Sequence, residues 1–121
     1  MISIIVPTFN RSKSLLVAIK SILKAKNQNI EIIIIDDASE DNTQETIQGL
    51  NNKSIKYLRN DTNIGTVKSK LKGLNIAKGD YMGFLDDDDI WTNELINFES
   101  DISSNCDIIL YNFQMYYKTD N

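Results

Sequence analysis

The sequence contains no histidine, one cysteine and one proline. Without histidine, nucleophilic catalysis by a Ser-His or Cys-His pair and zinc sites with histidine ligands are excluded. Because Cys106 is the single cysteine, an intrachain disulfide and a cysteine metal cluster are excluded as well. The cysteine usage therefore favours a reducing, cytoplasmic compartment.

Long apolar runs are also missing from the sequence. No run approaches the roughly 18 residues that span a bilayer, and the N-terminus MISIIVPTFNR lacks the basic lead and apolar stretch of a signal peptide. We therefore expect a cytoplasmic protein with no transmembrane segment; a position peripheral to the inner face of the membrane stays compatible with the sequence. Thirteen basic against seventeen acidic residues give a net charge of -4, which disfavours nucleic acid and anionic membrane surfaces as partners.

The apolar residues that are present fall into short runs bounded by polar turns. With 41% hydrophobic and 25% charged residues, the composition suits one folded domain over residues 1–121. The runs predict buried strands over residues 2–6, 30–35, 55–58, 81–85 and 108–111. Between the strands lie helical periodicities, so the chain is predicted to form an α/β sandwich with a mostly parallel, Rossmann-like sheet and helices on both faces.

Four helices are predicted between these strands. Three of them are marked by apolar faces formed by Leu15, Leu16, Ile19, Ile22 and Leu23, then Val67, Leu71, Leu74 and Ile76, and then Leu95, Ile96, Phe98 and Ile102. Asn42 and Glu45 have the spacing of a capping box and predict a short helix that ends near Gly49. Gly79 is predicted to stop the helix that precedes it.

Polar residues gather where the predicted strands end. Ligands of parallel α/β sheets bind beyond the carboxyl ends of the strands. The residues expected at that edge are Pro7, Thr8, Phe9 and Asn10 after the first strand, Asp36 and Asp37 after the second, residues 61–63 after the third, and Asp86, Asp87, Asp88 and Asp89 after the fourth. The convergence of acidic groups on one rim predicts a binding site.

The four consecutive aspartates of FLDDDDIW repel one another, and something must offset this repulsion. One interpretation is a site for Mg or Mn, which are commonly held by one or two carboxylates together with substrate phosphates and water. The alternative is a solvated acidic turn that caps the next helix, a role for which Thr92 is also suited. An EF-hand fits poorly, because Ile90 would take a ligand position and Trp91 the glycine position.

The other motifs are each open to two interpretations. Asp36 and Asp37 can accept hydrogen bonds from a nucleobase or a ribose, or can form a polar strand end before a turn. Pro7 either stops ladder pairing and presents backbone groups, or is a common proline between a strand and a turn. Gly65 leads into a helix whose N-terminus can face a phosphate, or is a loop glycine. Lys68 and Lys70 are candidates for contact with a diphosphate, or are exposed helix lysines.

Taken in order, four stretches resemble the start of the large family 2 of inverting glycosyltransferases with the GT-A fold. They are ISIIVPTFNR, IIIIDDASEDNT, NIGTVKSKLKGLNIAKGDY and FLDDDDIW, within residues 2–91. The resemblance implies a UDP-like nucleotide-sugar donor, an acceptor hydroxyl on a saccharide or another molecule, and Mn or Mg bridging the donor diphosphate. Residues 1–121 would then be the nucleotide-sugar-binding half of a GT-A domain.

The resemblance also assigns roles to individual residues. Pro7, Thr8 and Asn10 would border the nucleobase, and Asp37 would accept from the base with Asp36 beside it. Asp86 and Asp88 match the first and last acids of the DXD-type metal motif. Asp87 holds the variable middle position, Asp89 follows the motif, and Lys70 stands in the donor-binding helix.

The sequence departs from the family pattern in three places. Lys70 and Leu71 replace the usual Arg-Asn pair, which removes a bidentate guanidinium contact to the donor, and Ala38 replaces a glycine. The family's acceptor-binding half and its catalytic carboxylate come later than this chain extends, and Glu94, Glu99 and Asp101 follow the metal motif too closely. We therefore assign no catalytic base, and we expect donor binding without efficient transfer and self-association through uncovered apolar surface.

Three other classes of protein share features with this sequence. A receiver domain should carry its acidic pair after the first strand and a lysine after the fifth. A sugar nucleotidyltransferase should carry a glycine-rich loop with arginine after the first strand, where this chain has VPTFNR. A noncatalytic nucleotide-binding scaffold would keep the fold but show no effect of metal.

Overall fold

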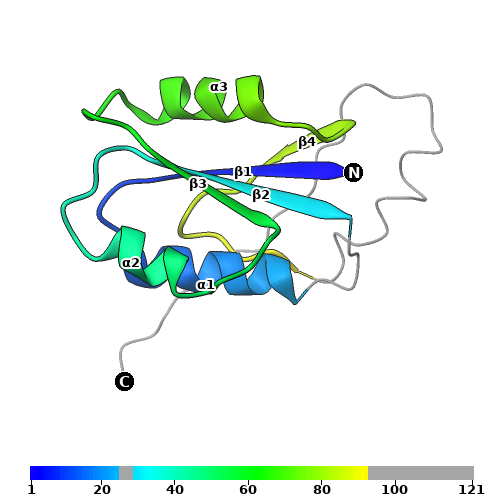
Figure 1. Cartoon of the computed structure of the whole chain (residues 1–121), viewed down its shortest axis with the longest axis horizontal. Helices are drawn as coiled ribbons and strands as arrows, with labels where there is room; N and C mark the ends of the chain where they lie inside the picture. Colours follow the sequence, from blue (N-terminus) through cyan, green and yellow to red (C-terminus); the bar gives the residue numbers. More distant parts are fainter. Residues whose placement is uncertain (25–28, 93–121) are drawn as a thin grey trace.

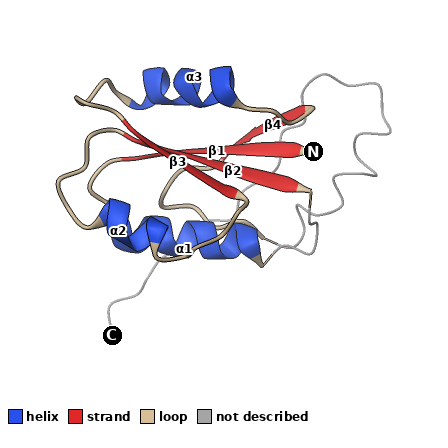
Figure 2. Ribbon diagram, in the orientation of Figure 1, coloured by secondary structure: helices blue, strands red, loops and turns tan. Residues whose placement is uncertain are grey.

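The computed structural model describes residues 1–24 and 29–92 (Figures 1 and 2). The elements in chain order are β1 (Ile2–Thr8), α1 (Ser12–Leu23), β2 (Ile30–Asp36), α2 (Thr43–Gln48), β3 (Ile55–Arg59), α3 (Thr66–Ile76) and β4 (Tyr81–Phe84). The first four predicted strands and first three predicted helices are confirmed. The predicted helix at Leu95 to Ile102 and the predicted strand over residues 108–111 lie outside the described residues.

The described strands form one parallel sheet in the order β3-β2-β1-β4. The central strand β1 pairs along its whole length with β2, from Ile2 opposite Ile30 to Thr8 opposite Asp36. Pairing of β1 with β4 is shorter and ends with Ile5 opposite Phe84. The carboxyl ends of β1, β2 and β4 therefore lie at one edge of the sheet, as the sequence predicted.

The prediction that Pro7 stops ladder pairing is wrong for the pairing of β1 with β2. Pro7 lies inside β1 and in register with Ile35. The Thr8 carbonyl accepts from the N–H of Asp37 on the β2 side, whereas the Ile5 carbonyl accepts from the N–H of Leu85 on the β4 side. Since the backbone groups of a strand alternate between its neighbours, the missing N–H of Pro7 faces β4 just where that pairing has ended.

Helices cover both faces of the sheet, with α1 and α2 on one side and α3 on the other (Figure 2). Alternating isoleucines divide the core between these faces: Ile4, Ile32 and Ile34 belong to the cluster that includes α1, and Ile5, Ile33 and Ile35 face α3. All six side chains are fully buried. Each contributes on the order of 2 kcal/mol of hydrophobic free energy, which makes the sheet a rigid support for the residues at its edge.

The apolar faces predicted for the two long helices are confirmed only in part. In α1, Leu15, Ile19 and Ile22 are buried as expected. In α3, Val67 and Leu71 are 72% and 54% exposed. The buried residues of that helix are Ser69 and Gly73, because α3 lies so close to the sheet that a Cβ atom at Gly73 would stand 2.5 Å from Ile5 Cγ2. Only Leu74 and Ile76 of the predicted face pack against the isoleucines.

Two predicted helix boundaries also differ. The capping box of Asn42 and Glu45 is wrong, since Asn42 makes no side-chain cap; the Asp41 carboxylate instead accepts from the N–H and hydroxyl groups of Thr43. Helix α3 ends at Ile76, and Gly79 lies further on, against the start of β1. A Cβ atom at Gly79 would stand 2.7 Å from the backbone nitrogen of Ser3, so the glycine permits close packing and does not end the helix.

Candidate functional site

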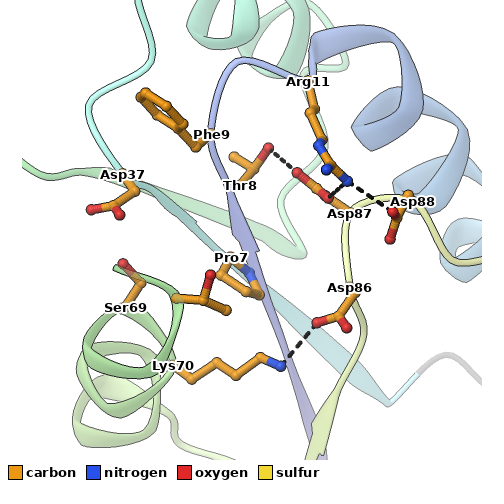
Figure 3. Close-up of a pocket in the computed structure, with 11 residues that line it drawn as sticks. Pro7, Thr8, Phe9, Arg11, Asp37, Ser69, Lys70, Asp86, Asp87 and Asp88 are labelled. Atoms are coloured by element: carbon orange, nitrogen blue, oxygen red, sulfur yellow. Dashed lines mark hydrogen bonds and ion pairs between the residues drawn. The ribbon is translucent and has the colours of Figure 1, made fainter. Parts of the chain in front are cut away.

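A cavity of about 400 Å³ opens at the carboxyl edge of the sheet, between the ends of β1 and β4 and the first turn of α3 (Figure 3). It is lined by Pro7, Thr8, Phe9, Arg11, Asp37, Thr66, Ser69, Lys70, Asp86, Asp87 and Asp88. Its volume is within the range of small-molecule sites. The lining combines carboxylates, two cationic side chains and hydroxyl groups, so the cavity suits a polar, charged ligand.

Most of the predicted site residues meet in this cavity. Eight of them line it: Pro7, Thr8, Phe9, Asp37, Lys70, Asp86, Asp87 and Asp88. Asn10 and Asp36 are not among the lining residues. Asn10 has a left-handed backbone with φ 53°, and its side-chain oxygen accepts from the N–H of Glu40 while its own N–H donates to Ser39. In this structure, Asn10 therefore holds two loops together.

Asp36 is turned to the opposite face of the sheet from the cavity. It is only 1% exposed and accepts hydrogen bonds from the hydroxyl of Tyr57 and the N–H of Ser39. Burial, followed by the bond to Asp36, raises the pKa of Tyr57, so this hydroxyl stays protonated and donates. Because successive residues of a strand point to opposite faces, only one member of the Asp36 and Asp37 pair can reach the cavity.

Asp37 is the member of the pair that reaches it. Its carboxylate accepts from the N–H groups of Ile64 and Gly65, each at 2.8 Å, and from the side-chain amide of Asn60 at 2.9 Å. Burial alone would raise the pKa of Asp37, but these donors outweigh it and hold the pKa below its usual value. Asp37 is thus a fixed carboxylate that orders the loop before α3 and still lines the cavity.

Asp87 and Asp88 are held by the last residue of β1, Thr8, and by Arg11. The Thr8 hydroxyl donates to Asp87 at 2.8 Å, and Nη1 of Arg11 lies 3.3 Å from Asp87 and 2.8 Å from Asp88 (Figure 3). The charge of Asp87, followed by the hydrogen bond to Asp88, raises the pKa of Arg11. Asp87 is buried whereas the Asp88 side chain is 58% exposed, so the two carboxylates have different surroundings.

On the other side of the cavity, Lys70 pairs with Asp86. The lysine Nζ lies 2.9 Å from Oδ1 of Asp86 and 5.7 Å above the centre of the Phe84 ring. Arg11 and Lys70 therefore offset the repulsion among the first three aspartates. Asp89 has no such cation in hydrogen-bond contact among the described residues; burial, then Asp88, Asp86 and Asp87, raise the pKa of Asp89.

The residues present fit a divalent cation only in part. Asp86 and Asp88 offer exposed carboxylate oxygens, which are suitable ligands for Mn²⁺ or Mg²⁺. Within residues 1–24 and 29–92, no group of three or more His, Cys, Asp or Glu side chains could hold a metal ion. A cation at this position would therefore need phosphate oxygens or water to complete its coordination, as Mg²⁺ commonly does.

The cavity also contains Arg11, Thr66 and Ser69, for which the sequence predicted no site role. Arg11 follows the expected residues of the first motif, but its distance from the aspartates depends on β4 pairing directly with β1. Thr66 and Ser69 occupy the first turn of α3, on the side facing the cavity. The position of Ser69 could have indicated a site role, because it stands next to Lys70 and outside the predicted apolar face of the helix.

No helix within the described residues is long and apolar enough to cross a membrane.

The acidic pair of Asp36 and Asp37 stands at the end of β2, and β1 lies between β2 and β4. A receiver domain would carry the pair after β1, so this alternative finds no support in the structure.

Comparison with known proteins agrees with this architecture. The model of the family described as Glycosyl transferase family 2 matches residues 3–119. The glycosyltransferase GlyG of Streptococcus pneumoniae is 32% identical over 99% of this chain and 41% of its own length. The GalNAc(5)-diNAcBac-PP-undecaprenol beta-1,3-glucosyltransferase of Campylobacter jejuni is 44% identical over 73% of this chain and 29% of its own length.

A solved structure leads to the same family. The crystal structure of Staphylococcus aureus TarS residues 1–349 in complex with UDP-GlcNAc superposes with a TM-score of 0.76 at 29% identity, over 83% of this chain and 30% of that chain. The expected GT-A type α/β fold is thereby confirmed. This chain spans less than half the length of each of these relatives. Since the family model covers nearly all of the sequence, the chain belongs to glycosyl transferase family 2.

Proposed function

We propose that this chain is the nucleotide-sugar-binding half of an enzyme that transfers a sugar from a UDP-like donor to an acceptor hydroxyl, with inversion and with a divalent metal. The observation that carries the proposal is the meeting of Asp37 with Asp86 and Asp88 in one cavity. A fixed carboxylate at one end suits the N–H edge of a base, and an acidic pair at the other suits a metal diphosphate. The complex of TarS with UDP-GlcNAc supports this choice of donor.

The base end of the cavity is formed by the end of β1 and by Asp37. Phe9 is 44% exposed and lies on the same side of the cavity as Asp37 (Figure 3). An exposed aromatic ring can stack on a base, which contributes about 1–3 kcal/mol in other nucleotide sites. Asp37 accepts from Ile64, Gly65 and Asn60, and a hydrogen bond from Ser69 also lowers its pKa, so an N–H of the base would share this carboxylate with the groups that already hold it.

The diphosphate end is formed by Asp86, Asp88, Lys70 and Arg11. Bound Mn²⁺ or Mg²⁺ would supply positive charge that neutralises the departing nucleoside diphosphate. Lys70 and Arg11 add two further positive charges at this end of the cavity. Asp87, held by Thr8 and Arg11, keeps the turn between Asp86 and Asp89 in place. These residues hold and orient the donor, which is the part of transfer catalysis that preorganised charge supplies.

The described residues give no catalytic base, and none is assigned. A group that removes the proton of the acceptor must lie within hydrogen-bond reach of the attacking oxygen. The carboxylates that line the cavity are engaged with Arg11, Lys70, Thr8 or the loop before α3. We therefore propose that this chain binds the donor and that efficient transfer requires residues beyond it.

Calorimetry with UDP, with and without Mn²⁺, tests this proposal. We expect UDP to bind in the presence of Mn²⁺ and to bind much more weakly without it or in Asp88→Ala. The matched control is Asp61→Ala, which removes an exposed carboxylate outside the cavity and should bind like the wild type. Metal-independent binding that Asp88→Ala leaves unchanged would favour a noncatalytic nucleotide-binding scaffold, and no binding by the folded protein would refute both functions.

Self-association and cellular location are part of the same proposal. Tyr81, Met82 and Phe84 of β4 are each more than 40% exposed, and β4 lies at the edge of the described sheet. Exposed apolar groups of this kind favour association between copies at high concentration. Sedimentation as a strict monomer at all concentrations would contradict this. The single cysteine supports a cytoplasmic location, which fractionation of cells would test.

A further inference from the structure

Arg11 joins two carboxylates that differ in accessibility. Its Nη1 atom lies 2.8 Å from Oδ2 of Asp88 and 3.3 Å from Oδ1 of Asp87. The side chain of Asp87 is 10% exposed and also accepts from Thr8, whereas that of Asp88 is 58% exposed. One contact of Arg11 is therefore with a fixed, buried carboxylate, and the other is with a carboxylate that solvent and ions can reach.

The contact with Asp88 is the exchangeable one. An exposed ion pair between two side chains adds little net free energy, because both partners are well solvated when apart. A divalent cation that takes the carboxylate of Asp88 competes with the guanidinium for the same oxygen atoms. Asp87 would keep Arg11 at the site during such an exchange, because Asp87 itself is held by Thr8.

The guanidinium has further N–H groups that can donate to a new partner. Within the described residues, the hydrogen bonds of Arg11 side-chain atoms all come from Nη1. The N–H groups of Nη2 and Nε lie in the same plane and match two phosphate oxygens. Arg11 also lines the cavity together with Lys70. Release of Asp88 therefore places a planar cation beside the position proposed for the diphosphate.

We propose that Arg11 is a positioning residue that holds Asp88 until a divalent cation takes this carboxylate, and that it then pairs with the donor diphosphate while remaining on Asp87. The inference rests on the proposed function and deepens it. It assigns to one arginine two successive tasks: keeping the metal motif in place, and neutralising the diphosphate once the motif holds a cation. Of the two cationic side chains that line the cavity, Arg11 has a planar guanidinium and Lys70 an ammonium, so a planar contact with two phosphate oxygens would come from Arg11.

Binding of Mn²⁺ alone tests the first half. Free Mn²⁺ is measured by electron paramagnetic resonance during titration of the wild type, Arg11→Gln and Lys13→Gln. Lys13→Gln is the matched control, because it removes the same charge from an exposed position two residues away. We expect Arg11→Gln to bind Mn²⁺ several-fold more tightly than Lys13→Gln. Equal binding, weaker binding or no binding by Arg11→Gln would overturn the exchange.

Binding of UDP at saturating Mn²⁺ tests the second half. We expect Arg11→Gln to lose about tenfold in UDP affinity relative to Lys13→Gln, the loss of a charge-assisted pair of hydrogen bonds. Arg11→Lys should fall between them, since an ammonium cannot bridge two oxygens in a plane. Equal UDP affinity of Arg11→Gln and Lys13→Gln would refute the diphosphate contact. If the wild type itself binds no UDP, the proposed function fails, while the Mn²⁺ comparison still decides the exchange.

Discussion

Thr8 and Asp87, 79 positions apart in the sequence, are joined by a hydrogen bond of 2.8 Å between two buried side chains. The bond ties the end of the central strand to the acidic turn that follows the edge strand. Asp87 is thereby fixed, and its exposed neighbours Asp86 and Asp88 are presented to the cavity from a turn of defined shape. Asp87 is thus the anchor of the acidic turn that follows β4.

Replacing Thr8 tests this anchor. Thr8→Val keeps the shape of the side chain but removes the hydroxyl, and we expect a loss of about 1–3 kcal/mol in the free energy of unfolding, because a buried carboxylate loses a donor. Urea denaturation measures this loss. Thr8→Ser retains the hydroxyl and should stay near the wild type. A Thr8→Val protein as stable as Thr8→Ser would show that Asp87 does not depend on this bond.

The carboxylate of Asp37 predicts sensitivity to acid. Its pKa is lowered in the folded state, so its contribution to stability is present above the unfolded pKa of about 3.9 and is lost as the pH falls through the folded value. Asp37→Asn replaces one acceptor by a donor that faces the N–H groups of the loop. We expect it to lose about 1–3 kcal/mol at pH 7 and to show a smaller further loss below pH of about 4. Thermal melting against pH measures both effects; parallel curves for the two proteins would contradict the prediction.

The ionised carboxylate of Asp89 is expected to lower stability, whereas that of Asp37 raises it. Partial desolvation and the neighbouring aspartates raise the folded pKa of Asp89, so its ionised form opposes folding at neutral pH, and this penalty disappears as the pH falls below the unfolded value. Asp89→Asn should therefore raise the free energy of unfolding at pH 7, by less than about 1 kcal/mol because the group is exposed, and should have no effect at about pH 3.5. Asp61→Asn, away from the acidic turn, is the control. A gain that persists unchanged in acid would exclude relief of charge repulsion as its cause.

The close approach of α3 to the sheet predicts the effect of Gly73→Ala. Alanine favours a helix over glycine by about 1 kcal/mol, but its Cβ atom would stand 2.5 Å from Ile5 Cγ2 in the core. Overpacking of this kind costs about 1–3 kcal/mol, so we expect a net loss of stability. Asn75→Ala, on an exposed position of the same helix, should instead be neutral or stabilising. Chemical denaturation of both variants decides, and a more stable Gly73→Ala would mean that Ile5 moves aside freely.

Local sequence patterns predicted the strands well but the packing of one helix poorly. Runs such as IEIIII strongly favour a buried strand. The alternation of strands with helices predicts that the strands are parallel. The apolar period of α3 pointed to Val67 and Leu71, which are exposed. The helix packs through Ser69 and Gly73 instead, because small side chains allow a close approach that hydrophobicity alone does not reveal.

The site was predictable where it depended on strand ends and unpredictable where it depended on neighbours in space. Asp37, Asp86 and Asp88 follow strands, so the edge rule placed them together. Asp36 belongs to the other face, which the alternation of side chains along β2 could have indicated. The pairing of Arg11 with Asp87 and Asp88 required knowing that β4 lies beside β1, and short-range spacing contains no such information.

The position of β1 at the centre of the sheet has a consequence for the kinetics of folding. Its pairing with β2 joins segments that are near in sequence, but its pairing with β4 closes a much longer loop, as the separation of Thr8 and Asp87 shows. Contacts at long sequence separation form slowly, because the entropy of loop closure is lost before the contacts form. The end of the cavity at Asp37 can therefore form before the end at Asp86 and Asp88, and the cavity is complete only when β4 joins the sheet.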